Sequence, residues 1–182
     1  MTCIVGYLDK KSDKVIIGGD SAGVAGFELS IRKDPKVFKN GDFIIGCTSS
    51  FRMIQLLRFS FTPPKTHDKD IYEYMCTDFI DAVRSCFKAG GFLEKQKESE
   101  VGGFFLVAHK NRLFQIQGDF QVSEQLNGMD SCGCGSAYAL GSLRCLVEAE
   151  FNLDPTEIVR RSLEAAEFFS AGVSRPFIIL ST

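Results

Sequence analysis

The order in which the hydrophobic period changes along the chain most limits what it can fold into. The first part contains short, apolar and β-branched runs, which predict strands. A part with apolar residues at spacings of three and four follows, which predicts amphipathic helices. The same change occurs a second time, and one last apolar run closes the chain. The chain is therefore predicted to be strands, two helices, strands, two helices and one strand, in that order.

Local signals place these segments. Asn40-Gly41 is a two-residue hairpin signal, Ser49 or Ser50 is a helix cap, and Asp154 with Glu157 three residues later begins the last helix. Residues 21–26 and the charged stretch 89–103 are predicted as loops, the second one mobile. Strands are predicted in residues 2–8, 14–20, 35–47 (two), 104–110, 111–119, 120–124 and 175–181, and helices in 49–59, 68–88 and from 154. Residues 131–151 are predicted to be a tight turn that enters a helix, with Ser136 near the start of that helix.

This element order fits two antiparallel sheets packed face to face with helices on the outside. It does not fit a regular alternation of strand and helix around a parallel sheet. We therefore expect an α+β protein with four layers in an αββα sandwich. The length of 182 residues suits one domain with a proper core, so residues 1–182 are predicted to be a single domain.

Composition and charge exclude several functions. The chain is 45% hydrophobic and 24% charged, with a net charge of −2, so it has no basic field to hold a nucleic acid. No apolar run approaches the roughly 20 residues that cross a bilayer. No basic segment followed by a long apolar one begins the chain, so no signal peptide is predicted. We expect a cytoplasmic protein without nucleic-acid or membrane partners.

Seven cysteines stand at irregular spacing, and several lie inside apolar runs. With no export signal, they are most simply reduced thiols. Cys132 and Cys134 form the one tight pair, but one intervening residue is not the usual zinc spacing, and the two histidines, His67 and His109, do not complete a site. No metal and no cofactor is predicted.

The first residues, Met-Thr-Cys, raise the possibility of a catalytic N-terminus. With two histidines, no G-x-S-x-G turn and no P-loop, a serine triad or a nucleotide site is not expected. If Met1 is removed, Thr2 carries a hydroxyl and a free α-amine. That amine, with a reference pKa near 7.7–8.0, can accept the hydroxyl proton near neutral pH. Thr2 would then be a nucleophile that brings its own base.

Several short motifs, in the right order, resemble one family. They are TCIVG, VIIGGDSAG, DPKVF, FIIGCTSS, CGCGSAYALGSL and FFSAGVSRPFIIL. Together they resemble proteasome β-type subunits, and in particular the bacterial proteasome-like peptidase that works with an unfoldase ATPase. Both are N-terminal-nucleophile hydrolases. The resemblance implies their fold, a threonine peptidase activity on peptide substrates, a homo-oligomeric ring and an ATPase partner.

The resemblance also implies residue roles. Thr2 takes the position of the nucleophile, Lys36 that of the active-site lysine, and Asp20 that of the aspartate that orients this lysine. A lysine charge beside the hydroxyl would favour the alkoxide. Gly46 matches the donor of a backbone N–H to the oxyanion, and a register three residues later would give this role to Ser49.

Further positions follow by resemblance alone. Cys134 stands where the family has a serine near the α-amine, and a thiol is the weaker hydrogen-bonding group. Four residues correspond to the lining of the substrate pocket: Ser21, Ala22, Ile31 and Thr48.

The sequence departs from the family in the segment before the last strand. There the usual aspartate and serine correspond to Phe168 and Ala171, with Ser170 adjacent. A retained Met1 would also place the α-amine on the wrong residue. Two alternatives therefore stay open: an amidohydrolase acting on small amides, and an inactive assembly protein. Cys3 is a second possible nucleophile, but exposing it would require the loss of two residues, so Thr2 is preferred.

Overall fold

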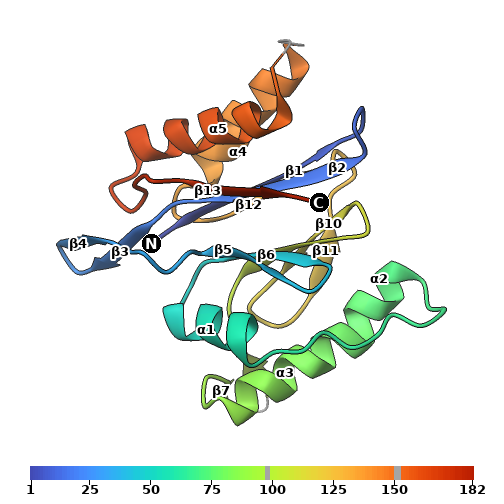
Figure 1. The fold of residues 1–182 in the computed structure, drawn as a ribbon. Helices are drawn as coiled ribbons and strands as arrows, with labels where there is room; N and C mark the ends of the chain where they lie inside the picture. Colours follow the sequence, from blue (N-terminus) through green and yellow to red (C-terminus); the bar gives the residue numbers. More distant parts are fainter. Residues whose placement is uncertain (97–98, 150–152) are drawn as a thin grey trace.

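The computed structural model describes residues 1–182 except 97–98 and 150–152. Two antiparallel sheets form the middle of the molecule (Figure 1). The first sheet has the order β12-β1-β2-β13, formed by Met129–Gly133, Cys3–Asp9, Lys14–Gly19 and Ile178–Ser181. The second has the order β11-β10-β9-β6-β5, formed by Val122–Glu124, Arg112–Ile116, Phe105–His109, Phe43–Cys47 and Val37–Asn40.

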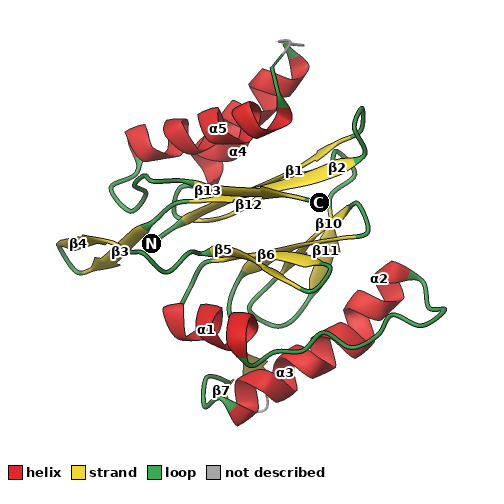
Figure 2. Ribbon diagram, in the orientation of Figure 1, coloured by secondary structure: helices red, strands yellow, loops and turns green. Residues whose placement is uncertain are grey.

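Helices cover the outer face of each sheet, as Figure 2 shows. The first sheet carries α4 (Ser136–Glu148) and α5 (Pro155–Phe169), and the second carries α1 (Phe51–Phe59), α2 (Ile71–Tyr74) and α3 (Ile80–Ala89). The layers therefore run helix, sheet, sheet, helix. This confirms the αββα sandwich that the order of hydrophobic periods predicts.

The two sheets face each other across an apolar layer. β1 and β2 are buried on both faces, which is why their sequences read as nearly continuous apolar runs. Ile4 and Ile17 from the first sheet meet Val37 and Leu106 from the second in this layer. β1 lies between β12 and β2, so the beginning of the chain is tied into the centre of a sheet.

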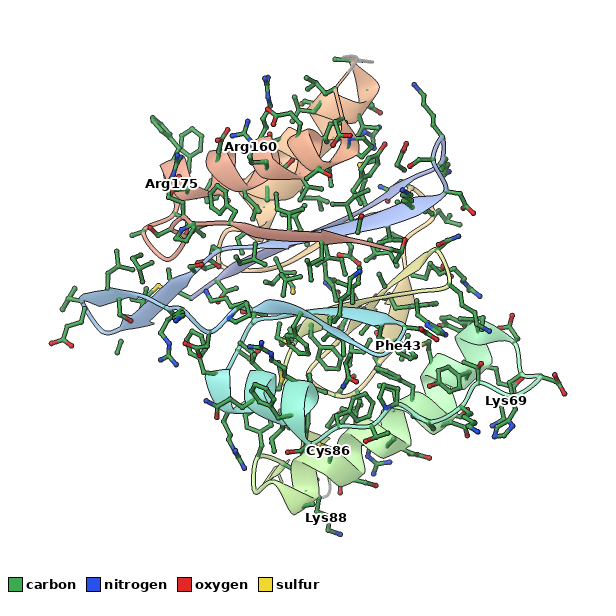
Figure 3. The ribbon with its side chains drawn as sticks, viewed as in Figure 1. Phe43, Lys69, Cys86, Lys88, Arg160 and Arg175 are labelled. Carbon is green, nitrogen blue, oxygen red and sulfur yellow. The ribbon has the colours of Figure 1, made fainter. Side chains whose placement is uncertain are left out.

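Each outer layer buries the apolar stripe of its helices. On the first sheet, α5 turns Ile158, Val159 and Leu163 inward. On the second sheet, aromatic rings fill the space under the helices, and Figure 3 shows Phe43 there, between sheet and helix, whereas Lys88 points away from the body. These stripes are the pattern that predicts the helices.

The helix predicted in residues 68–88 begins and runs differently. Asp70 caps it, because its carboxylate accepts the N–H groups of Tyr72 and Glu73. Its middle, Met75–Phe79, is a π-helical turn between α2 and α3. The extra residue in this turn shifts the apolar stripe, which a regular period of 3.6 does not anticipate.

Two segments predicted as loops contain paired strands. Residues 21–26 belong largely to β3 (Ala22–Ala25), which pairs with β4 (Glu28–Ile31). Within 89–103, β7 (Glu94–Gln96) pairs with β8 (Ser99–Val101), and residues 97–98 lie outside the described residues. β12 (Met129–Gly133) extends into the tight turn predicted from 131, and α4 begins at Ser136, where the helix after that turn is predicted to start. Residues 150–151 of that predicted segment are likewise outside the described residues. These strands are short and lack a long apolar alternation, so periodicity does not reveal them.

Candidate active site

A buried ion pair stands at one end of the sandwich. Asp20 follows β2 directly, and Lys36 directly precedes β5. The Lys36 Nζ lies 2.9 and 3.0 Å from the two carboxylate oxygens of Asp20. Asp20 is only 1% exposed and Lys36 only 3%. Two residues 16 positions apart in the sequence thus meet where two strands of different sheets end.

Backbone donors hold the Asp20 carboxylate in place. Oδ1 accepts the N–H of Cys3 at 2.9 Å, and Oδ2 accepts the N–H groups of Ala22 at 2.8 Å and Ser174 at 3.4 Å. These donors come from the first strand, the residue after the turn and the segment before the last strand. Because Lys36 shares Oδ1 with Cys3, the lysine is anchored beside the beginning of β1.

Burial lowers the pKa of Lys36 from its usual value, since a desolvated ammonium is disfavoured. The charge of Asp20 and its hydrogen bond oppose this by favouring the protonated lysine. The site therefore combines a desolvated cation with a fixed counter-charge, a combination found at catalytic centres.

Thr2 lies beside this pair and is only 4% exposed. Its backbone N–H donates to the Cys134 Sγ at 3.3 Å, and its carbonyl oxygen accepts the N–H of Gly135 at 3.3 Å. Thr2 and Lys36 line one small cavity of about 90 Å³. Met1 is present, so the Thr2 nitrogen is an amide, and the Thr2 hydroxyl contacts the carbonyl oxygen of Met1.

The β12–α4 turn approaches the beginning of the chain very closely. Gly133 has a φ of +104°, and a Cβ there would lie 2.2 Å from the Thr2 carbonyl oxygen. Only glycine fits both the backbone conformation and the space. This glycine places Cys134 next to Thr2, as the resemblance implies.

Gly46 does not offer a free N–H. It lies in β6 between β5 and β9, paired with Val37 and Leu106. The N–H of Thr48 donates to Phe104, so by the alternation of an antiparallel ladder the Gly46 N–H points to Leu106. The geometry thus corrects the expectation for Gly46.

Ser49, the alternative in the later register, has a different environment. It follows β6 at a φ of +67° and lines the cavity of Thr2 and Lys36. Within the described residues, its N–H has no acceptor. Its hydroxyl accepts the N–H of Phe104 at 3.1 Å, which fixes the turn. The geometry therefore favours Ser49 as the N–H donor.

The four pocket residues divide into two groups. Thr48 lines the cavity of Thr2, and Ile31 is exposed on β4. Ser21 and Ala22 are buried: the Ser21 hydroxyl donates to the Pro176 carbonyl at 2.6 Å, and the Ala22 N–H is bound by Asp20. The geometry corrects the expectation that these two side chains line a pocket, because their surfaces are already covered.

Cys3 is an unsuitable nucleophile in this structure. It is fully buried in β1, and burial raises the pKa of its thiol to about 12. A thiol of such a pKa carries almost no thiolate at neutral pH. The geometry thus supports the preference for Thr2.

Two serines near the site receive no role in the sequence analysis. The Ser170 Oγ lies 3.5 Å from the Cys134 Sγ, and the Ser174 N–H reaches Asp20. In this segment, Ser170 is the polar side chain next to Cys134, whereas Phe168 is exposed to solvent. Its position next to the family's missing serine in the sequence is the only signal for it.

Among the described residues, no three His, Cys, Asp or Glu side chains are grouped to hold a metal ion. All seven cysteines are free thiols. No helix in the described ranges is long and apolar enough to span a bilayer.

Comparison with solved structures identifies the fold. No protein-family model matches the chain. The structure of Thiobacillus denitrificans BPH in complex with epoxomicin superposes with a TM-score of 0.83 at 19% identity, covering 100% of this chain and 98% of that one. Eukaryotic HslV from Trypanosoma brucei gives a TM-score of 0.70 at 19% identity, over 99% and 98%. The fold is that of the proteasome-like N-terminal-nucleophile hydrolases.

One sequence relative is more specific. The chain is 24% identical over 160 residues to the ATP-dependent protease subunit HslV of Caldicellulosiruptor saccharolyticus, covering 86% of this chain and 85% of the relative. By sequence, the chain is therefore a homologue of HslV, in agreement with the resemblance seen in its motifs.

Proposed function

We propose that this chain is a threonine-type N-terminal-nucleophile peptidase in which Thr2 is the nucleophile once Met1 has been removed. The observation that carries the proposal is the buried Lys36–Asp20 pair, because Lys36 and Thr2 line one cavity. A buried ion pair is a poor way to stabilise a fold, since desolvation offsets much of the attraction. Beside the hydroxyl of an N-terminal residue, the pair provides a fixed positive charge that favours the alkoxide, which helps a nucleophile that has no histidine as its base.

The reaction begins with proton transfer from the Thr2 hydroxyl to the free α-amine of the same residue. The Oγ1 atom then attacks the carbonyl carbon of the peptide bond, and the leaving amine takes up a proton. This gives an ester between Thr2 and the acyl part of the substrate. Water, activated by the same amine, hydrolyses the ester and restores the hydroxyl.

The surrounding groups act on charge and position. The Lys36 ammonium favours the alkoxide, and Asp20 fixes this lysine. Ser49 lines the same cavity, and in this proposal its N–H stabilises the developing oxyanion, a contribution worth roughly 10²–10³ in rate for one donor. Cys134 holds the Thr2 nitrogen, so it would position the amine after Met1 is lost.

The assembly is also a proposal. The relative's name describes a subunit of an ATP-dependent protease. We therefore infer a homo-oligomeric ring with an ATPase partner that supplies unfolded peptide, in the cytoplasm. Enclosing the nucleophile in a ring would prevent indiscriminate cleavage.

The test is covalent labelling. Chain without Met1, verified by intact mass, is incubated with epoxomicin, the compound bound to the related BPH. One adduct per chain is expected, and peptide mapping should place it on Thr2. The Thr2→Ala variant should show no adduct and no peptidase activity, while Thr62→Ala, at an exposed loop position, should behave as the parent.

The other outcomes separate the alternatives. Hydrolysis of small amides without any cleavage of peptides would support the amidohydrolase. No adduct on the chain lacking Met1, together with unchanged background activity in Thr2→Ala, would reject catalysis by Thr2 and leave the assembly protein.

A further inference from the structure

The peptide bond between Met1 and Thr2 joins an exposed residue to a buried one. Met1 is 55% exposed, whereas Thr2 is 4% exposed and Cys3 is fully buried. An aminopeptidase must bind the terminal residue and also extend the chain behind it through its own cleft. In this fold, Thr2 is already buried and β1 begins at Cys3, so the chain that follows Met1 is not free to extend.

Several contacts hold the residue behind the bond. The Thr2 N–H donates to the Cys134 Sγ, and the Thr2 carbonyl oxygen accepts from the Gly135 N–H at 3.3 Å and from the Cys134 Sγ at 3.4 Å. The next N–H, of Cys3, is bound by Asp20. Freeing Thr2 would break all of these bonds and peel the end of β1 from two neighbouring strands.

We propose that Met1 must be removed hydrolytically before the beginning of the chain docks into the sheet, and that a chain that folds first is trapped in an inactive form. Water adds across the Met1–Thr2 amide and gives free methionine and the Thr2 amine. In the trapped form, the Thr2 nitrogen is an amide that cannot act as a base, and the Thr2 hydroxyl contacts the Met1 carbonyl.

The topology leaves time for this trimming. Cys3 pairs with Gly133, and Met1 packs on Gly172, so docking of the chain end needs partners from far along the sequence. At 5–20 residues per second of synthesis, those partners emerge on the order of 10 s after the first residues. The nascent N-terminus stays accessible during this interval.

The test makes trimming and folding compete. Full-length chain that retains Met1 is prepared with the host methionine aminopeptidase inhibited, and then unfolded in urea. It is diluted into refolding buffer, and purified methionine aminopeptidase is added after increasing delays. Intact mass measures the loss of Met1, and circular dichroism measures refolding. Trimming should slow by about 10- to 10³-fold as the fold forms, because several hydrogen bonds must open first.

A pair of cysteine variants tests the contacts in the chain purified in its folded form. Cys134→Ala removes the sulfur that binds Thr2, so trimming should accelerate by about 10-fold. Cys145→Ala, at an exposed thiol on α4, should match the parent. Equal trimming rates in the folded and freshly diluted chain would overturn the proposal, as would loss of Met1 without any aminopeptidase.

This inference rests on the proposed function only for its consequence, the inactivity of the trapped form. The mass readout does not depend on peptidase activity. Protection of Met1 without labelling of Thr2 in the trimmed chain would reject the proposed function alone.

Discussion

At the scale of single residues, the site is organised around one carboxylate. Asp20 accepts three backbone N–H groups from separate parts of the chain and the Lys36 ammonium. Its negative charge is balanced by Lys36 within a nearly water-free environment. Neither residue can therefore be changed alone without leaving the other uncompensated.

Lys36→Met tests this balance. Removing the cation leaves the Asp20 charge buried and unpaired, so unfolding free energy should fall by about 3–5 kcal/mol. The double variant Lys36→Met/Asp20→Asn should recover part of this loss, because no isolated charge remains. Urea unfolding measures both, with Lys88→Met, at an exposed position on α3, expected within about 0.5 kcal/mol of the parent. If Lys36→Met were as stable as Lys88→Met, the charge of Asp20 would not depend on Lys36 for its compensation.

Gly133→Ala tests the close approach to Thr2. The new Cβ would overlap the Thr2 carbonyl oxygen and force alanine into a φ of +104°, so a loss of about 1–3 kcal/mol and displacement of Thr2 are expected. Gly141→Ala is the matched control. Apart from its chain neighbours and the backbone of α4 itself, no described atom lies within 4 Å of its Cβ position, so this change should stabilise the chain by up to about 1 kcal/mol. Thermal unfolding and the yield of epoxomicin adduct measure the two variants, and equal behaviour would be inconsistent with the crowding at Gly133.

At the scale of elements, strand ends position the chemistry and helices cover it. Asp20 follows β2, Lys36 precedes β5, Ser49 follows β6, and Cys134 follows β12. Side chains at strand ends are fixed by the sheets and still reach a common cavity. Between the second sheet and its helices α1, α2 and α3 lie many aromatic rings. His109 packs among them.

His109, at the end of β9, couples this layer to pH. Its ring stacks on Phe43 with 3.9 Å between centroids, and its buried Nε2 has no hydrogen-bond partner among the described residues. Burial lowers the pKa of His109, so below about pH 6.5 the unfolded chain binds a proton more readily than the folded chain. Stability should therefore fall as the pH drops below about 6.5.

The measurement is the urea midpoint at pH 7.5 and at pH 5.5. The midpoint of the parent should fall more over this interval than that of His109→Gln, which cannot titrate there. His67→Gln, at the exposed histidine, should keep the slope of the parent. Identical slopes in the parent and His109→Gln would show that the buried imidazole does not contribute.

At the scale of the whole molecule, exposed apolar side chains fit the proposed ring. Phe27 and Leu29 stand on the β3–β4 hairpin, which projects beyond the sandwich in Figure 1, and Phe168 lies at the end of α5. Such surfaces are typical of contacts between subunits. Light scattering should therefore report a mass several times the 20.1 kDa of one chain. A single species of one-chain mass at high concentration would argue against a ring.

The amino-acid sequence by itself determined the layers and much of the site. The change of hydrophobic period placed the main strands and helices, since burial of one face or one stripe is a local property of the sequence. Ordered motifs singled out Thr2, Asp20 and Lys36, which the fold brings together. The pairing of β3 with β4 and the pairing of β7 with β8 were missed because short strands with little alternation leave no periodic signal.

Only the tertiary structure decided which backbone groups are free and which residues support the site. Gly46 and Ser49 are three residues apart and fit the motif in different registers, yet pairing with β9 engages one N–H and not the other. Likewise, Ser170 meets Cys134 across 36 positions, and Ser174 meets Asp20 across 154. Local pattern cannot report such pairings, because they depend on where the two sheets place the ends of distant strands.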